Sequence, residues 1–138
     1  MASLPAMSRT FTVEQANRML PLVRRIVEDI VSHHADWQQV VGEFEVASAT
    51  VPATPRAIEL QQHAERLAGD IERFIGKLSA LGVEFKGFDL GLVDFPSERD
   101  GQPVLLCWKL NEPAVAHWHA REDGFAGRQP LTPVSSAP

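Results

Sequence analysis

The sequence predicts an α+β fold, with a long antiparallel two-helix hairpin followed by a small three-stranded antiparallel β meander. Two observations lead to this class. Up to Leu81 the apolar residues recur in alternating steps of three and four, as in heptad-patterned helices. After Gly82 they form short β-branched or aromatic runs between turn signals, which is typical of strands. At 138 residues the chain fits one domain, which we place at 11–131, with disordered ends at 1–10 and 132–138.

The first predicted helix spans 11–45. Thr12 and Gln15 match a capping box, in which each side chain bonds to the backbone amide of the other residue. Pro21 lies inside this helix and predicts a kink near Asn17 to Pro21, because its ring crowds the preceding turn. The apolar seam of the helix consists of Ala16, Leu20, Val23, Val27, Ile30, His34, Trp37, Val41 and Phe44.

The second predicted helix spans 54–82, after a small, polar, proline-containing connection. Thr54 is a suitable N-cap, and Pro55 stands at the first helical position, where a missing amide hydrogen costs little. Gly82 supplies a left-handed residue at the end of the helix. The seam consists of Ala57, Leu60, Ala64, Leu67, Ile71, Phe74, Leu78 and Leu81.

The meander and a glycine-rich loop occupy 88–131. Strands are predicted near 90–95, 104–110 and 115–119, and the Asp100-Gly101 pair is a hairpin signal between the first two. A sheet this small needs a helix to pack against.

A homodimer is the expected quaternary state. A lone hairpin leaves apolar side chains beside its seam exposed, namely Met19, Ile26, Val40 and Ile75. A second copy would cover them in a four-helix bundle. The alternative is that the small sheet folds back over part of the same surface.

Charge and hydropathy exclude several classes of partner. The formal net charge is −5 and the basic residues are scattered, which argues against nucleic acid and acidic membrane surfaces. No apolar run is long enough to span a bilayer, and the N-terminus lacks the features of a signal peptide. The expected compartment is therefore the cytoplasm. The nature of any small-molecule ligand is left open.

Three stretches carry a family resemblance: FTVEQANRMLPLVRRIVEDI, LGVEFKGFDLGLVDFPSERDGQPVLLCWKL and EPAVAHWHAREDGFAGRQPL. They resemble the domain of unknown function family 2203, a group of small prokaryotic proteins, and the match runs from about Phe11 to Leu131. The most specific parts are GLVDFP, LCWKL and GFAGRQPL in this order. The resemblance implies a bacterial cytosolic protein. It implies no activity and no catalytic residues.

The best candidate for chemistry is the stretch AVAHWH in the third strand. His117 and His119 lie one residue apart and therefore point to the same face of a strand. Neutral imidazoles bind transition metals, so the pair predicts a site for Zn or Fe. The supporting ligands we expect are Asp94, Cys107 and Glu122, with Glu112 and Asp123 as further carboxylates.

The geometry of this site depends on strand register. A turn at Asn111-Glu112-Pro113 places Cys107 opposite His119 in one register, and a slip of one residue turns Cys107 to the other face. Histidines with carboxylates would leave positions open for water or oxygen, whereas a closed set that includes Cys107 would be structural. The alternatives are histidines with ordinary hydrogen bonds and a buried core thiol at Cys107.

The run Gly124 to Arg128 offers a second kind of site. Its backbone amides, with Gly127 among them, would form an anion-binding concavity, and Arg128 would clamp a phosphate or carboxylate. The alternative is a simple turn in which Arg128 pairs with Asp123 or Asp94.

The sequence thus predicts a metal-binding protein. If the metal keeps open coordination positions, the prediction is a small metalloenzyme. The competing hypothesis is a non-enzymatic dimeric helical-hairpin adaptor or scaffold.

Overall fold

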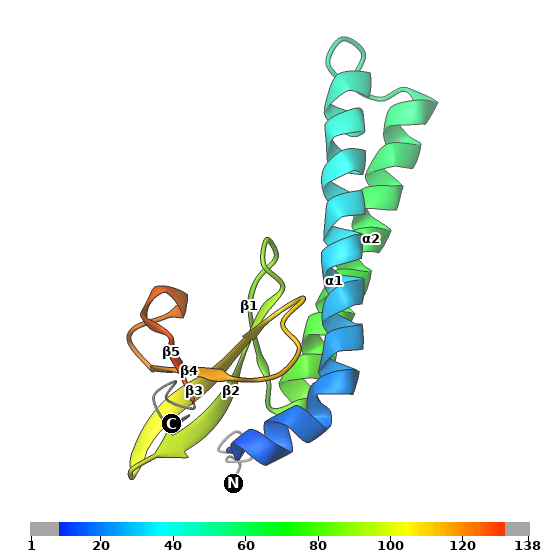
Figure 1. The fold of residues 1–138 in the computed structure, drawn as a ribbon. Helices are drawn as coiled ribbons and strands as arrows, with labels where there is room; N and C mark the ends of the chain where they lie inside the picture. The colour runs from blue at the N-terminus through cyan, green and yellow to red at the C-terminus, as the bar shows by residue number, and fades with distance from the viewer. Residues whose placement is uncertain (1–8, 132–138) are drawn as a thin grey trace, which may run out of the picture.

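The computed structural model describes residues 9–131 and confirms the α+β class (Figure 1). Helices α1 (Val13–Ala47) and α2 (Pro55–Leu81) form the antiparallel hairpin. An antiparallel sheet follows and packs beside the N-terminal part of α1. The far half of the hairpin projects beyond the sheet as an arm (Figure 1). The predicted disorder of 1–10 and 132–138 lies almost entirely outside the described residues.

The helices begin and end close to the predicted positions because their caps form. Thr12 Oγ1 accepts a bond from the Gln15 amide at 3.0 Å, and Gln15 Oε1 accepts one from the Thr12 amide at 2.9 Å. At the start of α2, Thr54 Oγ1 accepts a bond from the Ala57 amide at 3.1 Å, and Gly82 ends the helix with φ +88°. α1 contains Pro21, and its N-terminal, blue part is bent as the sequence predicts (Figure 1).

The prediction of three strands is wrong: over residues 9–131 the sheet has five strands, in the order β1-β2-β3-β4-β5. The strands are β1 (Glu84–Gly87), β2 (Leu92–Arg99), β3 (Gln102–Lys109), β4 (His117–Ala120) and β5 (Gln129–Pro130), with a short 3-10 helix, η2 (Phe125–Gly127), before β5. The sequence pattern did not predict β1 and β5 because both are short strands at the edges of the sheet. β1 contains a bulge, and β5 has only two residues, one of them a proline.

The β2–β3 hairpin forms around the predicted turn. Asp100 and Gly101 adopt φ angles of +53° and +78°, which a tight two-residue turn requires. The hairpin pairs Leu92 with Lys109 at one end and Arg99 with Gln102 at the other. β2 and β3 thus correspond to the first two predicted strands, 90–95 and 104–110, although their ends are displaced by a few residues.

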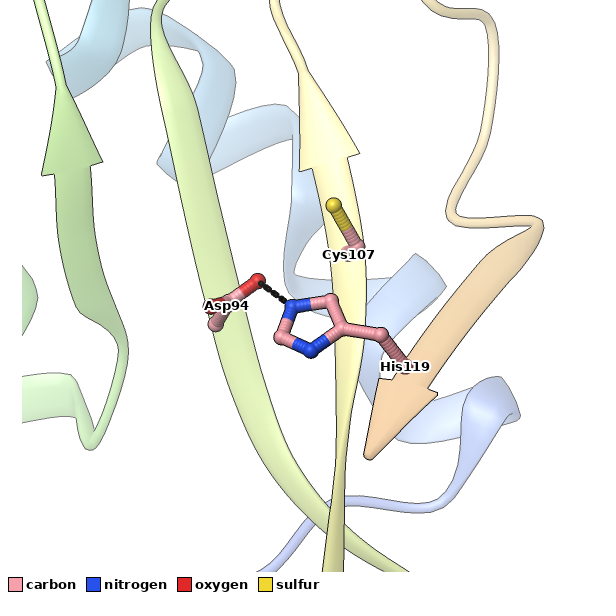
Figure 2. Close-up of side chains that lie close together, drawn as sticks. All are labelled: Asp94, Cys107 and His119. Atoms are coloured by element: carbon pink, nitrogen blue, oxygen red, sulfur yellow. Dashed lines mark hydrogen bonds and ion pairs between the residues drawn. The ribbon is translucent and has the colours of Figure 1, made fainter. Parts of the chain in front are cut away.

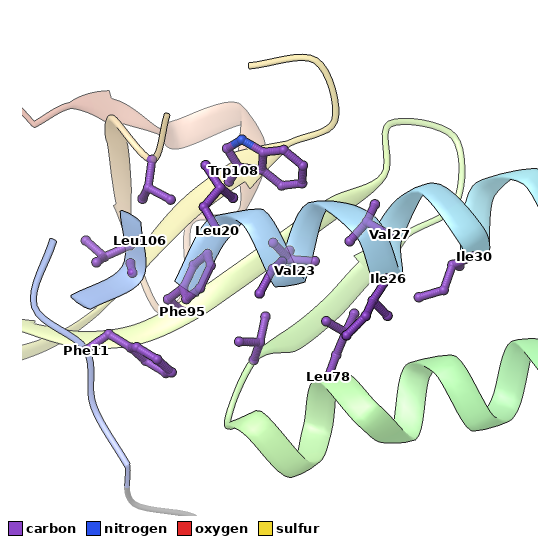
Figure 3. Packing of buried hydrophobic residues seen from close by; sticks show 14 of the residues in the cluster. Phe11, Leu20, Val23, Ile26, Val27, Ile30, Leu78, Phe95, Leu106 and Trp108 are labelled. Carbon is purple, nitrogen blue, oxygen red and sulfur yellow. The ribbon is translucent and has the colours of Figure 1, made fainter. Parts of the chain in front are cut away.

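One face of the sheet packs against the helices and forms the main core. Phe95, Leu106 and Trp108 lie on this face and meet Leu20 and Val23 of α1 (Figure 3). Trp108 is fully buried, and its Nε1 donates to the Glu112 carbonyl at 3.0 Å. Since side chains alternate along a strand, the residues between these core positions point to the opposite face.

The apolar residues that suggested a homodimer are covered within the chain. Ile26 is buried, and Met19 and Ile75 are half-buried against the main core. Val40 is buried with Leu60 and Leu67 in a smaller cluster in the arm. The sheet has folded back over the hairpin, as in the alternative. The homodimer stays a prediction, but these side chains no longer argue for it.

Within residues 9–131, none of the helices combines the length and the apolar character needed to cross a membrane.

Candidate metal centre

Three adjacent strands bring Asp94, Cys107 and His119 together on the face of the sheet opposite the main core (Figure 2). Asp94 of β2 is directly opposite Cys107 of β3. Cys107 is opposite His117 of β4, and His119 is opposite Leu105. The expected direct pairing of Cys107 with His119 is therefore wrong by two residues. Because the shift is even, all four side chains remain on one face, and His119 reaches Asp94 diagonally across β3.

The three side chains are enclosed. The side chains of His119 and Asp94 are 3% and 4% exposed, and Cys107 is fully buried. One nitrogen, sulfur or carboxylate oxygen of each residue lies within 4.8 Å of the others. Buried polar groups of this kind need partners, because the loss of water around them costs free energy.

The hydrogen bonds of His119 fix which ring nitrogen faces the cluster. Nδ1 lies 2.8 Å from the Ala120 carbonyl oxygen, which only accepts, so Nδ1 carries a hydrogen and donates it. Nε2 lies 3.2 Å from Asp94 Oδ1. In a neutral ring Nε2 then presents a lone pair, and a lone pair repels a bare carboxylate at this distance. A proton or a metal ion must therefore lie between the two atoms.

The ionisation of the two acidic groups is shifted by burial. Burial raises the pKa of the Asp94 carboxyl, although the neighbouring His119 opposes this shift. Burial also raises the pKa of the Cys107 thiol to about 11, although Arg128 donates a hydrogen bond that favours the thiolate. Without a metal ion, Cys107 is therefore a protonated thiol near neutral pH.

A cysteine, a histidine and an aspartate also suggest a nucleophilic triad, but the arrangement does not support one. A triad histidine uses one nitrogen for the acid and the other for the nucleophile. Here the second nitrogen of His119 is taken by the Ala120 carbonyl. The high pKa and the complete burial of Cys107 are also opposite to what a reactive thiol requires.

His117, the other half of the predicted His-x-His pair, lies outside the cluster. Its side chain is 31% exposed, and its Nδ1 lies 3.9 Å from Glu112 Oε2. This distance is too long for a hydrogen bond, and Nδ1 is buried without a partner among the described residues. The structure thus separates the two histidines, although they share one face of β4.

Glu112 forms a structural ion pair with Arg128. Its carboxylate also accepts the Lys109 amide at 3.0 Å. Burial alone would raise the pKa of Glu112, but the hydrogen bonds from Arg128 and Lys109 outweigh it and lower the pKa. The Arg128 guanidinium contacts both carboxylate oxygens, and both side chains are 14% exposed. This pair holds the glycine-rich loop over the sheet beside Cys107, whose Sγ lies 3.7 Å from Arg128 Nη1.

The predicted anion-binding residues are occupied within the chain. Arg128 pairs with Glu112 rather than with Asp123 or Asp94, the partners considered from the sequence. The amides of Gly127 and Arg128 donate to the carbonyls of Gly124 and Phe125. Gly127 has a steric role instead, because a Cβ at this position would lie 2.8 Å from the Cβ of Asp123. Anion binding here would require these contacts to break.

Glu122 and Asp123 follow β4 on the surface and are exposed. Glu122 lines a hollow with Arg121 and Trp118 rather than the buried cluster. Of the five predicted metal ligands, the structure therefore brings together Asp94, Cys107 and His119, and it leaves His117 and Glu122 outside.

The hairpin, the five-stranded antiparallel sheet and the buried Asp–Cys–His cluster define an α+β protein with a set of potential metal ligands in its sheet. The chain belongs to the family described as "Uncharacterized conserved protein (DUF2203)", which it matches over residues 9–131. This confirms the resemblance seen in the sequence. The chain has no significant match among curated proteins or among solved structures.

Proposed function

We propose that this protein binds a divalent transition metal, preferably Zn²⁺, through an Asp94 carboxylate oxygen, Cys107 Sγ and His119 Nε2. One observation supports this above all: Nε2 faces a buried carboxylate at 3.2 Å while Nδ1 donates to a backbone carbonyl. Metal-binding histidines are usually held in this way, since the bond at one nitrogen directs the lone pair of the other.

The donor atoms favour zinc over harder cations. Thiolate, imidazole and carboxylate together suit a borderline-soft ion, whereas Mg²⁺ and Ca²⁺ prefer oxygen alone. Zinc bonds of about 2.0–2.3 Å place tetrahedral ligands about 3.3–3.6 Å apart. The His119–Asp94 separation is close to this value. We expect the remaining donor atoms, which lie within 4.8 Å, to draw together when the ion binds. Fe²⁺ is the second choice.

The burial of the ligands favours a structural role over catalysis. Side chains that are at most 4% exposed leave a substrate no direct approach to the ion. A metal at this point would instead cross-link β2, β3 and β4 at the centre of the sheet. Its binding free energy would then add to the stability of the fold, because the unfolded chain does not assemble the site.

Metal binding is tested on untagged protein that has been stripped with a chelator. We expect one equivalent of Zn²⁺ to bind in a competition titration against a chromophoric chelator. At a free concentration about 100 times Kd, the ion should raise the free energy of unfolding by about 2.7 kcal/mol. Co²⁺ in place of zinc should show thiolate charge-transfer absorption in the near ultraviolet, which reports on Cys107 directly.

Matched variants separate the proposed ligands from their neighbours. Asp94→Asn, Cys107→Ser and His119→Gln should each abolish stoichiometric binding, whereas His117→Gln, on the same strand and the same face, should retain it. The side-chain amide that Asp94→Asn introduces would still donate to His119 Nε2, so this variant should remain folded. Wild-type protein that binds no zinc, cobalt or iron would end the proposal, as would binding that depends on His117 and not on His119.

A further inference from the structure

The arm of the hairpin carries an apolar groove that the rest of the described chain does not fill. Trp37, Val41 and Phe44 of α1 form one wall, and Ala64 and Ala68 of α2 form the other. All five side chains are half-buried. Large residues on one helix thus face small residues on the other, and this leaves a furrow along the arm.

The groove is continuous with the rings beside the sheet. Phe88, in the turn after β1, stacks on His34 with ring centroids 4.0 Å apart, and His34 stacks on Trp37 at 5.9 Å. This row of rings leads from the sheet into the groove. The groove therefore begins where the sheet stops covering the hairpin, and beyond this point the arm stands free (Figure 1).

The charge of the arm is strongly acidic. Within 33–69, the basic residues are Arg56 and Arg66, against the acidic Asp36, Glu43, Glu45, Glu59 and Glu65. Glu45 and Glu65 stand at the groove, one on each helix. Among residues 9–131 neither takes part in an ion pair, and Glu65 accepts a 3.5 Å bond from the neutral amide of Gln61. An apolar furrow is thus bordered by carboxylates without a cation.

We infer that this groove binds a basic amphipathic helix of another protein. An amphipathic helix places its apolar face in a groove and its charged residues along the rim. Apolar side chains of the partner would pack against Trp37, Val41 and Phe44, while its lysines or arginines would pair with Glu45 and Glu65. Trp37 is the expected centre of the interface, because tryptophan often dominates the binding energy of such contacts.

A second copy of this chain is the less suitable occupant. Its own arm carries the same excess of carboxylates, so contact between two arms would place like charges together. The apolar residues that suggested a dimer are already covered by the sheet or by the second helix.

The test uses a fluorescently labelled helical peptide of leucine and lysine as the probe, with the full-length protein titrated into it. Fluorescence anisotropy should show saturable binding at one peptide per chain. Ala68→Arg, which places a bulky cation in the groove, and Trp37→Ala should each weaken binding about tenfold or more. Ala68→Arg alters a half-buried surface position and should fold normally, which circular dichroism checks.

The charge contribution needs its own control. The Glu45→Gln, Glu65→Gln double variant should bind several-fold more weakly at low salt and show a smaller dependence on salt. The control is a Glu28→Gln, Glu98→Gln variant, which has the same net charge as the Glu45→Gln, Glu65→Gln variant but keeps both groove carboxylates. It should bind the peptide like the wild type. Equal binding of a leucine–glutamate peptide, or no effect of the groove variants, would overturn the inference. So would a wild-type dimer in sedimentation equilibrium that Ala68→Arg converts to a monomer.

Discussion

Among the single residues, His119 is oriented by the bond from its Nδ1 to the carbonyl of Ala120. This local contact determines that Nε2 faces Asp94, so the buried pair must share either a proton or a metal ion. Cys107 is then the third donor, kept protonated by its surroundings until an ion displaces the proton. The chemistry of the cluster is therefore decided by competition between protons and metal.

Metal loading should release the proton of Cys107. The thiol pKa of about 11 means that the metal-free protein holds this proton near neutral pH, while a metal-bound sulfur is a thiolate. A pH indicator in weakly buffered solution should record the release when Zn²⁺ is added near pH 7. The apparent affinity should rise by about tenfold per pH unit for each proton released.

The control for proton release is Cys107→Ala, which loses a proposed ligand. At zinc concentrations that saturate the wild type, this variant should bind no stoichiometric zinc and release no corresponding proton. Equal release from this variant and the wild type would show that Cys107 Sγ is not a ligand, even if zinc binds.

Among the elements of the fold, the turn between β1 and β2 depends on close packing against α1. Gly91 has φ +59° and is buried between Leu110 and α1. A Cβ at this position would lie 2.9 Å from the Leu110 Cβ and 3.0 Å from Val27 Cγ1. This glycine therefore allows the start of β2 to approach the helix, and β2 carries Asp94.

Gly91→Ala should lower the free energy of unfolding by about 2–4 kcal/mol. The new Cβ would overlap atoms of the core, and the alanine would also have to adopt a left-handed backbone conformation. Gly101→Ala is the matched control: it has φ +78° but meets nothing within 4 Å, and should cost only about 1 kcal/mol. Urea unfolding measures both values. Equal losses in the two variants would mean that the packing at Gly91 contributes little.

For the whole molecule, stability in the absence of metal should decrease as Asp94 ionises. Burial raises the pKa of this carboxyl above its ordinary value of 3.8, so the folded state holds the proton more tightly than the unfolded state. The contribution of Asp94 to the free energy of unfolding is therefore largest below pH 3.8. This contribution falls as the pH rises from 3.8 through the pKa of Asp94 in the folded state. The total loss is about 1.4 kcal/mol for each pH unit by which the folded pKa exceeds the unfolded one.

Asp94→Asn cannot ionise and should not show this decrease. In chelator, the stability of the variant relative to the wild type should therefore increase as the pH rises above about 4. Urea unfolding at a series of pH values measures the difference. Saturating Zn²⁺ should stabilise the wild type and leave the variant unchanged. If the metal-free wild type instead gained stability relative to Asp94→Asn as the pH rose above about 4, the raised pKa of Asp94 would be contradicted.

The sequence by itself determined the parts of the fold that depend on neighbours along the chain. The caps at Thr12 and Thr54, the left-handed Gly82 and the Asp100-Gly101 turn are local interactions, so their residue types are enough to predict them. Helical seams are also local, since a period of three to four residues is visible in any window. For the candidate site, the sequence named Asp94, Cys107 and His119 among five expected ligands, but it did not show which of the five meet.

Only the tertiary structure decided which of these residues meet. Cys107 is paired with His117, yet His119 is the histidine that reaches Asp94, because the contact is diagonal and depends on the register of three strands. The Glu112–Arg128 pair and the packing of Phe95 and Trp108 against α1 depend likewise on where the loop and the sheet fold back. The free energy of these contacts comes from groups distant in sequence, so no local pattern of residues records them.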